Sequence, residues 1–490
     1  MARKSKTNKK FKKIGMFISI LLFIFAYGTL GLVTYMGILP SKYLYPAIGV
    51  VVFITLILFI TMLKPKGKKI FKVIAWIISL AITAICAFAD WNIYKTYDFL
   101  ADINKTKATY ENYYVMVRKN SAIERIEDIK DMEVQVFDED TEIYDEALAK
   151  LKKKVSVDID KVKSVSDLGT NLLTEKSDVI FISEVSKTTI EDDNKDFKDK
   201  TKIIETIKVK VDSKNTATKK PKNKDIFTIY LGGTDSYGTI YSRSRSDVNM
   251  LVTINKKNHE ILLVSIPRDY YITLNGKGAK DKLTHAGIYG VETSIKSIED
   301  FMDVDINYYF RVNFSTLTKV VDTIDGVDVY SDRAFVPWTD RSVYINKGMN
   351  HMNGKKALAF ARERYAYKEG DVHRVQNQQA VITAIIKKVS SNKSILLRYS
   401  SILDSLQGSF QTNVTMNEIS ALVNEQLNSM PDWQIAKYNL NGTGAHKSCY
   451  SMGAGELYVM IPNEETIDQA SDYINDMIDG KTLEDLGLSE

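Results

Sequence analysis

The pattern of apolar and polar positions divides the chain into a membrane part and an exported part. Three apolar stretches without any charged residue occupy positions 14–39, 43–63 and 73–89. An α-helix needs about 20 such residues, and at least about 17, to cross a bilayer. A cleaved signal peptide would have a shorter apolar run than the first stretch, and further spans would not follow it at once. We therefore predict three transmembrane helices within residues 14–89.

Basic residues predict the direction in which these helices cross. The tail at 1–13 contains seven Lys or Arg and no acid, and the loop after the second span reads KPKGKK. The positive-inside bias places both in the cytoplasm and places the PSKYLYP loop, with its single Lys42, outside. Three crossings then put everything after Asp90 outside the cytoplasm, in a multi-pass protein of the cell membrane.

The remaining chain is predicted to form two α/β domains. Residues 90–211 alternate short apolar runs such as MEVQVF with helix-like stretches, which is typical of a small α/β domain, here interpreted as an accessory domain. Residues 212–224, DSKNTATKKPKNK, contain no large apolar residue and predict a linker. From 225 to 490, DIFTIYLGG, NMLVTIN and EILLVSIP predict the buried strands of a second, larger domain.

Charge and cysteine content bear on several functional classes. The net charge of +5 is too small to indicate nucleic-acid binding. Cys86 lies within the third span and Cys449 far downstream, so no disulfide framework is available. The histidines show neither an HExxH motif nor paired spacing, and a zinc site is not expected.

One stretch of the second domain, Lys355–Gln379, contains three arginines spaced to converge on an anion. Arg362 and Arg364 are two residues apart, so an extended segment would place both side chains on one face. Arg374 and Gln378 would share one face of a helix. Guanidinium groups bind phosphate oxygens in bidentate geometry, which predicts a phosphate or pyrophosphate ligand. The alternative is a solvated surface with weak ion pairs.

Acidic residues follow the predicted strands of the same domain. Asp235 comes directly after the first strand, and Asp247 lies at the start of the next. Ligands of α/β sheets bind at such strand ends, where two carboxylates would share one Mg²⁺ ion. Either aspartate alone could instead form an Asx turn or begin a strand.

Two further clusters mix basic and acidic residues: Arg268 with Asp269 after Pro267, and Asp281 with Lys282. The domain offers no Ser-His-Asp or Cys-His candidate. Arginines and aspartates of this kind predict a metal-assisted site for phosphoryl or pyrophosphoryl transfer, in which the protein mainly positions groups and stabilises charge.

Seven motifs follow the three spans in this order: LGGTDSYG, SRSDVN, SIPRDYY, DKLTHAGIYG, NYYFRVNF, LAFARERY and HRVQNQQ. In this order they closely resemble the LytR-CpsA-Psr (LCP) family over the whole second domain. The spans and the accessory domain are similar to the capsule-associated branch of that family. The resemblance implies an α/β fold in which helices flank both faces of a central mixed sheet, with an apolar groove for a lipid tail.

The resemblance also implies an activity. The family transfers a glycopolymer, as its sugar 1-phosphate, from polyprenyl (undecaprenyl) pyrophosphate to a muramic acid hydroxyl of peptidoglycan, with Mg²⁺ as cofactor. The polymer implied for this branch is a capsular polysaccharide, and capsule assembly proteins are further candidate partners. Nucleic acid is not an expected partner.

Residue by residue, the matching motifs imply a site. The metal is expected at Asp235 and Asp247. The pyrophosphate is expected at Arg245, Arg268, Lys282, Arg362, Arg364, Arg374 and Gln378. Catalysis is assigned to Arg268, Asp269, Arg362 and Arg364, with Asp269 or another site carboxylate as the proton acceptor. Many members carry an Arg soon after the first Asp, where this chain has Ser236 and Tyr237, and whether Arg243 compensates stays open.

Three other functions agree with parts of the sequence. A membrane-bound transcriptional regulator is disfavoured because the cytoplasmic part is too small for a DNA-reading fold. A non-catalytic receptor for polyprenyl lipids in capsule assembly would use the same groove and arginines. A lipid pyrophosphatase would use the same site without a sugar acceptor.

Overall fold

The chain forms two compact units. The computed structural model describes residues 2–35, 39, 41–64, 68–103, 109–137, 141–162, 164–194, 196–211, 218–234, 243–368, 370–406 and 408–489. The first unit comprises Met1–Asn104, Val389–Ser405 and Val414–Asp432. The second comprises Lys105–Lys388, Leu406–Asn413 and Trp433–Glu490.

Three long apolar helices dominate the first unit: α1 (Ala2–Tyr35), α2 (Ser41–Leu63) and α3 (Lys69–Ile103). Segments long and apolar enough to cross a membrane occur in each, at Lys12–Tyr35, Ser41–Leu63 and Lys69–Trp91. A seam that includes Leu22, Met62 and Ala75 is buried between the helices, whereas Phe17 and Phe53 are exposed, as expected of residues that face lipid. The predicted N-terminal apolar helices are confirmed, and their length and composition suit a membrane anchor.

Three short helices also belong to the first unit: α13 (Lys393–Leu397), α14 (Tyr399–Ser405) and α15 (Met416–Ser429). Lys42, in the first turn of α2, donates a hydrogen bond to the carbonyl oxygen of Asn428. The Lys393 ammonium lies 4.9 Å from the centroid of the Tyr43 ring. Part of the chain between 225 and 490 therefore packs with the membrane helices, which the apolar pattern alone does not indicate.

The smaller sheet of the second unit has five strands in the order β3-β2-β4-β1-β5. They are β1 (Thr109–Arg118), β2 (Glu133–Phe137), β3 (Asp158–Val162), β4 (Val179–Ser183) and β5 (Thr201–Val211). Helix α4 (Glu142–Lys154) packs on one face, and α5 (Val165–Leu173) and α6 (Glu184–Asp193) pack on the other. The α/β character expected of the accessory domain is confirmed.

The accessory domain shares part of its core with the larger domain. Leu168 and Ile190 are buried together with Met452 and Val459, which belong to the turn and second strand of a hairpin formed by β16 (Gly442–Cys449) and β17 (Gly453–Pro462). The backbone N–H of Val165 donates to the Met452 carbonyl at 3.2 Å. The two α/β domains are thus packed against each other.

The larger sheet has six strands in the order β14-β11-β6-β7-β8-β15. They are β6 (Ile226–Thr234), β7 (Val248–Asn255), β8 (Glu260–Ile266), β11 (Tyr308–Asn313), β14 (Phe410–Thr412) and β15 (Gln434–Asn439). Strand β11 runs parallel to β6 and β15 runs parallel to β8, whereas the other neighbours are antiparallel. The sheet is therefore mixed.

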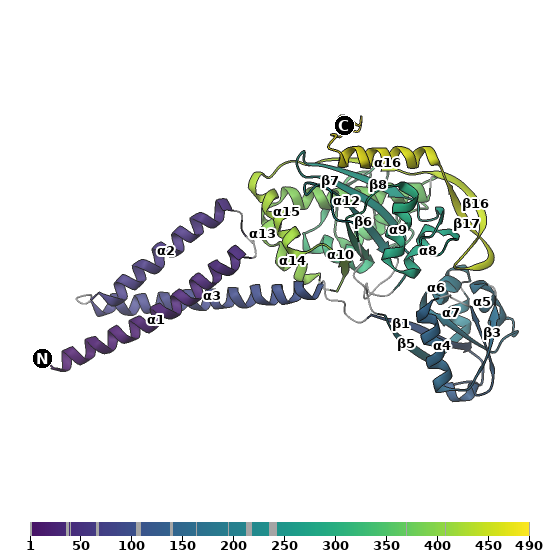
Figure 1. The fold of residues 1–490 in the computed structure, drawn as a ribbon, viewed down its shortest axis with the longest axis horizontal. Helices are drawn as coiled ribbons and strands as arrows, with labels where there is room; N and C mark the ends of the chain where they lie inside the picture. The colour runs from purple at the N-terminus through teal and green to yellow at the C-terminus, as the bar shows by residue number, and fades with distance from the viewer. Residues whose placement is uncertain are drawn as a thin grey trace. The chain divides into compact units, whose positions relative to one another are not determined.

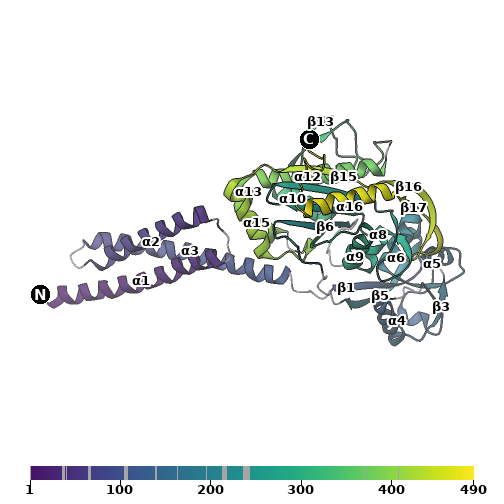
Figure 2. The ribbon, with the colours of Figure 1, turned by 45° about the horizontal axis from the view of Figure 1, so that its top comes forward.

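Helices cover both faces of this sheet (Figures 1 and 2). Side chains of a strand alternate between its faces. Leu251 and Leu262 accordingly pack with helices α9 (Val291–Met302) and α16 (Glu464–Ile478), while Met250 and Leu263 pack with α12 (Asp371–Ser391). The predicted central mixed sheet flanked by helices is confirmed.

Seven further elements lie in the connections of the larger domain. They are β9 (Tyr271–Thr273), β10 (Lys280–Lys282), α8 (Leu283–Ala286), α10 (Phe314–Thr323), β12 (Val327–Ser331), β13 (Gly348–Met352) and α11 (Gly354–Ala361).

Candidate active site

One edge of the larger sheet collects the loops that carry the predicted site residues. Gly233, near the end of β6, pairs with Val248 at the start of β7, and Ile266 at the end of β8 pairs with Asn249. Asn313, at the end of β11, pairs with Thr234. The ends of β6, β8 and β11 and the start of β7 therefore meet at the same edge.

Backbone hydrogen bonds join these loops to one another. The N–H of Ser246 donates to the Thr284 carbonyl at 2.9 Å, and the N–H of Thr284 donates to the Arg268 carbonyl at 2.8 Å. Thr284 thus lies between the loop before β7 and the loop after β8. Because these contacts involve backbone atoms, the relative positions of the residues beside them are fixed.

Asp247 and Arg268 form an ion pair at this edge. Arg268 Nη1 lies 2.6 Å from Asp247 Oδ1, and only 11% of the Asp247 side chain is exposed. Burial alone would raise the pKa of Asp247, but the guanidinium groups of Arg268, Arg245 and Arg374 outweigh it and lower the pKa below its usual value. Asp247 is therefore a carboxylate at neutral pH, surrounded by cations.

Asp269 lies between two cations. Lys282 Nζ is 3.1 Å from Asp269 Oδ1, and Arg268 Nε is 3.5 Å from Asp269 Oδ2. The pairing of β9 with β10 places Lys282 opposite Tyr271, two residues after Asp269. Since each oxygen of Asp269 faces a cation, this carboxylate orients Arg268 and Lys282.

Two more arginines contact Asp371 at the start of α12: Arg374 on the same helix and Arg364 in the turn after α11. Arg374 Nη2 lies 2.9 Å from Asp371 Oδ1, and Arg364 Nη1 lies 3.9 Å from the same oxygen. Arg374 is 9% exposed, and burial lowers its pKa although Asp371 opposes this effect. Gln378 follows one helical turn after Arg374 and is partly buried.

Two guanidinium nitrogens of this cluster are buried without a hydrogen-bond acceptor. They are Nε of Arg268 and Nε of Arg374, judged against the part of the chain that the structure describes. Buried N–H donors are normally satisfied, and each unsatisfied one costs about 1–3 kcal/mol. Phosphate oxygens would satisfy both donors, so the cluster fits a phosphorylated ligand.

Arg362 and Arg364 do not lie in an extended segment, and that prediction is wrong. KKALAFA forms helix α11, and Arg362 ends it with φ −97° and ψ −6°. Buried Glu363 then folds the chain into a turn: its Oε1 accepts hydrogen bonds from the N–H groups of Tyr365 (2.6 Å) and Ala366 (2.8 Å). The Arg362 guanidinium lies 4.0 Å from the ring centroid of Phe314, which follows β11 directly at the site edge. Both arginines thus remain beside the site.

Three functionally placed residues were not predicted: Arg311, Glu363 and Asp371. Arg311, on β11, is 6% exposed and donates from Nη2 to Ser244 Oγ at 3.0 Å, and burial lowers its pKa. A signal for Arg311 exists in the sequence, because it shares its strand face with Tyr309 and Asn313, which are also buried. An acid such as Asp371 in a first helical turn is common and carries no such signal.

Arg243 lies against the accessory domain. Its Nε is 3.2 Å from Oε1 of Glu111 on β1. The contact therefore joins the loop before β7 to the smaller sheet, and Arg243 has no described contact with the carboxylate of Asp247.

The expected metal pair lies partly outside the described residues. Asp235, with Ser236 and Tyr237, falls in 235–242, directly after β6. The described partner, Asp247, suits a hard cation because it is ionised and Arg268 contacts only its Oδ1. The Asp247 carboxylate is a ligand type that Mg²⁺ accepts, and binding of the metal by Asp235 and Asp247 stays a prediction.

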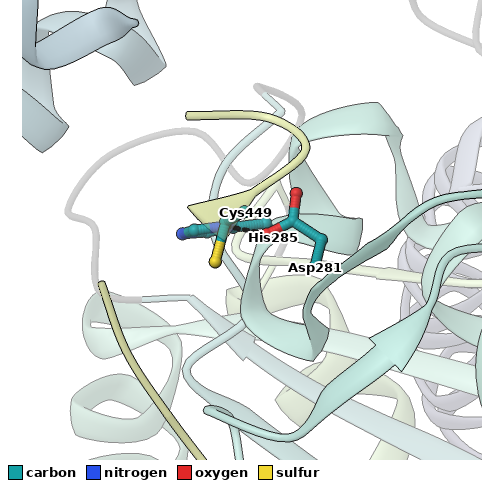
Figure 3. Close-up of side chains that lie close together, drawn as sticks. All are labelled: Asp281, His285 and Cys449. Carbon is teal, nitrogen blue, oxygen red and sulfur yellow. Dashed lines mark hydrogen bonds and ion pairs between the residues drawn. The ribbon is translucent and has the colours of Figure 1, made fainter. Parts of the chain in front are cut away.

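A buried polar network begins at Asp281, next to Lys282 in the chain, and Figure 3 shows Asp281 with His285 and Cys449. Asp281 Oδ1 lies 2.6 Å from His285 Nδ1, and Asp281 Oδ2 accepts from the backbone N–H (2.8 Å) and hydroxyl (2.5 Å) of Ser451. Cys449 is the third ligand-type side chain nearby. Two ligands of one zinc ion would stand about 3.3 Å apart, so the 2.6 Å contact is a hydrogen bond. The network connects β10 and α8 to the β16–β17 turn.

Acid should weaken this network. Burial raises the pKa of Asp281, but His285 and Ser451 outweigh it, so the folded pKa lies below the usual 3.8. Such a carboxylate stabilises the fold above the unfolded pKa, and this contribution is lost as the pH falls through the lower folded value. Asp281→Asn should therefore lower the free energy of unfolding at pH 7 by about 2–3 kcal/mol. Thermal unfolding measured from pH 7 to pH 3 should show that this loss of stability becomes smaller as the pH falls. The exposed control Asp468→Asn should show no loss of stability. A loss that stays the same at every pH would contradict the role of the Asp281 charge.

This geometry defines a class of protein. Its members have apolar N-terminal helices and an α/β domain in which arginines and aspartates lie together at one edge of the sheet. The LytR_cpsA_psr family model matches residues 179–472. This match spans more than half of the chain and covers all of the loops just described. The chain therefore belongs to the LytR-CpsA-Psr family.

Known relatives include transferases of cell-wall polymers. The polyisoprenyl-teichoic acid–peptidoglycan teichoic acid transferase TagU of Bacillus cereus is 38% identical over 209 residues, which are 42% of this chain and 67% of that protein. TagT of Bacillus subtilis, with the same activity in its name, is 33% identical over 234 residues, 46% of this chain and 71% of that protein. The crystal structure of B. subtilis TagV matches with a TM-score of 0.45 and 26% identity, over 53% of this chain and 100% of that chain.

Proposed function

We propose that the protein transfers a capsular polysaccharide, as its sugar 1-phosphate, from undecaprenyl pyrophosphate to peptidoglycan at the outer face of the membrane, with Mg²⁺. The observation that carries this proposal is the cluster in which Arg268 and Arg374 each bury an N–H group without an acceptor, next to Asp247. A pyrophosphate offers the charge and the acceptor oxygens that this cluster needs. The names of the relatives support a polyprenyl-linked donor and a peptidoglycan acceptor.

Transfer breaks one phosphoanhydride bond. The acceptor hydroxyl oxygen forms a bond to the phosphorus that carries the sugar, the bridging oxygen leaves with polyprenyl phosphate, and the hydroxyl proton passes to a base. Arg268, Arg364 and Arg374 bind the phosphate oxygens and stabilise the charge that develops on them. Arg245 and Arg362 lie at the same edge and are expected to contribute. Mg²⁺, held by Asp235 and Asp247 when bound, supplies further stabilisation of this charge.

The proposed topology places this chemistry beside both substrates. The basic tail and the KPKGKK loop favour a cytoplasmic N-terminus. The first residues of α2, Lys42 and Tyr43, contact α15 and α13, which supports placing this end of α2 and the exported part on one side of the membrane. A lipid-linked donor in the outer leaflet and an acceptor in the wall would then both reach the site.

The test uses the full chain in detergent, incubated with a lipid-pyrophosphate-linked oligosaccharide, a peptidoglycan fragment and Mg²⁺. Mass spectrometry should detect a phosphodiester-linked adduct that is lost on chelation and in Asp247→Asn, while Asp468→Asn, on the exposed face of α16, should keep it. Release of lipid phosphate without an adduct would instead identify a pyrophosphatase. Tight lipid binding without turnover would identify a receptor.

A further inference from the structure

An exposed aromatic surface lies next to the arginine turn. Phe335 and Ile345 pair across an antiparallel bridge and are buried, so Val336 and Tyr344, one position further on each side, share the opposite, exposed face. Trp338, two residues after Val336, is 59% exposed, and Tyr365 is 65% exposed. The Trp338 and Tyr365 rings contact each other, with centroids 5.2 Å apart. We name Val336, Trp338, Tyr344 and Tyr365 the aromatic platform.

Glu363 fixes this platform to the active-site turn. Its Oε2 accepts a hydrogen bond from the backbone N–H of Trp338 at 2.6 Å, while Oε1 accepts from Tyr365 and Ala366. The side chain is buried, so these hydrogen bonds are protected from water. Trp338 and Tyr365 are therefore held in a fixed position relative to the turn that carries Arg362 and Arg364.

Guanidinium groups border the two rings. Arg341 Cζ lies 4.4 Å from the Trp338 centroid, and Arg364 Cζ lies 5.5 Å from the Tyr365 centroid. The surface thus combines aromatic faces with fixed positive charge. Aromatic faces carry partial negative charge that attracts polarised C–H groups, which line the faces of pyranose rings, and arginines bind carboxylates. An acidic glycan has both features.

We propose that the aromatic platform binds the glycan strand of the peptidoglycan acceptor, with a sugar ring stacked on Trp338 and Tyr365 and a carboxylate of the strand near Arg341. This inference rests on the transferase function proposed above and names residues that position its acceptor. A strand within the wall is too long to enter a closed cavity, so an exposed surface beside Arg364 suits it.

A binding experiment tests the platform without any donor. The full chain in detergent is sedimented with peptidoglycan sacculi stripped of wall polymers. Trp338→Ala should bind about tenfold more weakly, as expected for loss of an aromatic anchor, and Trp338→Phe should stay within about twofold of wild type. Tyr458→Ala, which removes an exposed aromatic ring from β17, is the matched control and should not change binding. Wild-type binding by Trp338→Ala would overturn the proposal.

A second variant, which changes a charge, tests the proposal even if Trp338→Ala fails to fold. Arg341 is exposed, so Arg341→Glu should fold normally and still bind sacculi several-fold more weakly, because it repels the carboxylates. Equal sedimentation of Arg341→Glu and wild type would overturn the role of charge. Wild-type flotation with phosphatidylglycerol vesicles that is lost in Trp338→Ala, together with unchanged sacculus binding, would assign the platform to a lipid surface instead.

Turnover measurements separate this inference from the proposed function. In Trp338→Ala, the apparent KM for the acceptor should rise about tenfold while the KM for the donor stays unchanged. If only the KM for the donor rose, the platform would bind the sugars of the donor polymer, and the proposal would be overturned. If the wild type forms no adduct yet binds sacculi through Trp338, the transferase function fails and only the binding surface stands.

Discussion

Replacing Arg268 with Ala should lower the transfer rate by about 10³-fold or more, the size of effect seen when phosphoryl-transfer enzymes lose an arginine that stabilises the transition state. Arg268 contacts Asp247 at 2.6 Å and approaches Asp269 at 3.5 Å, and its Nε lacks an acceptor among the described residues. Its removal therefore takes away an N–H group that would donate a hydrogen bond to the phosphate. It also takes away the cation that pairs with Asp247 and Asp269. The adduct assay under saturating donor measures this loss.

Two variants sharpen the result. Arg268→Lys keeps the charge but not the fork of N–H donors, so we expect an intermediate loss of about 10–100-fold. Arg398→Ala removes an exposed arginine whose described hydrogen bond reaches only the Ser394 carbonyl, and it should keep wild-type activity. A rate for Arg268→Ala within tenfold of wild type would show that Arg268 is only a structural partner of Asp247.

Glu363→Ala should have the largest effect on stability of any single change near the site. One buried carboxylate accepts hydrogen bonds from three backbone N–H groups, those of Trp338, Tyr365 and Ala366. Truncation leaves buried donors without acceptors, each at a cost of about 1–3 kcal/mol. We expect a loss of about 3 kcal/mol or more, read as a drop in Tm on the order of 5–10 °C.

Glu363→Gln offers a finer comparison. The amide retains one acceptor oxygen and turns an NH₂ group toward backbone donors, so its Tm should lie between those of wild type and Glu363→Ala. Transfer activity should fall in both variants because Arg362 and Arg364 lose their fixed turn. Glu484→Ala, at an exposed position, is the control. Unchanged activity with a lowered Tm would mean that the turn is needed for folding and not for substrate binding.

Much of the fold could be predicted because its signals are local. Apolar runs without charge predicted the spans, and short apolar segments ending in turn residues predicted β6, β7 and β8. The strand ends also predicted where Asp247 and Arg268 would lie, since ligands gather at such ends. Their pairing follows from the antiparallel register of β7 with β8.

Other features depend on contacts between distant segments and could not be predicted. KKALAFARER carries arginines at a spacing that suits a strand, but helix α11 ends only at Ala361. Glu363 then bends the chain by accepting hydrogen bonds from Tyr365 and Ala366, and it also accepts one from Trp338, 25 positions earlier. The pairing of Arg243 with Glu111 likewise joins two domains. Asp235, the other expected metal ligand, lies outside the described residues, so its placement stays a prediction.

The charged loops lie together at one edge of the larger sheet. Substitutions in this domain should therefore fall into two classes with different phenotypes. Among the described residues, the cores on either face, around Leu262 and around Leu263, contain no site residue. Substitutions there should reduce the amount of folded protein while each surviving molecule keeps its normal turnover. Substitutions of the partly exposed Arg268 and Arg364 at the edge should leave protein levels intact and, if the proposed function holds, stop attachment of polymer to the wall. Such inactive but abundant chains would then compete with wild-type protein for donor lipid in a mixed population.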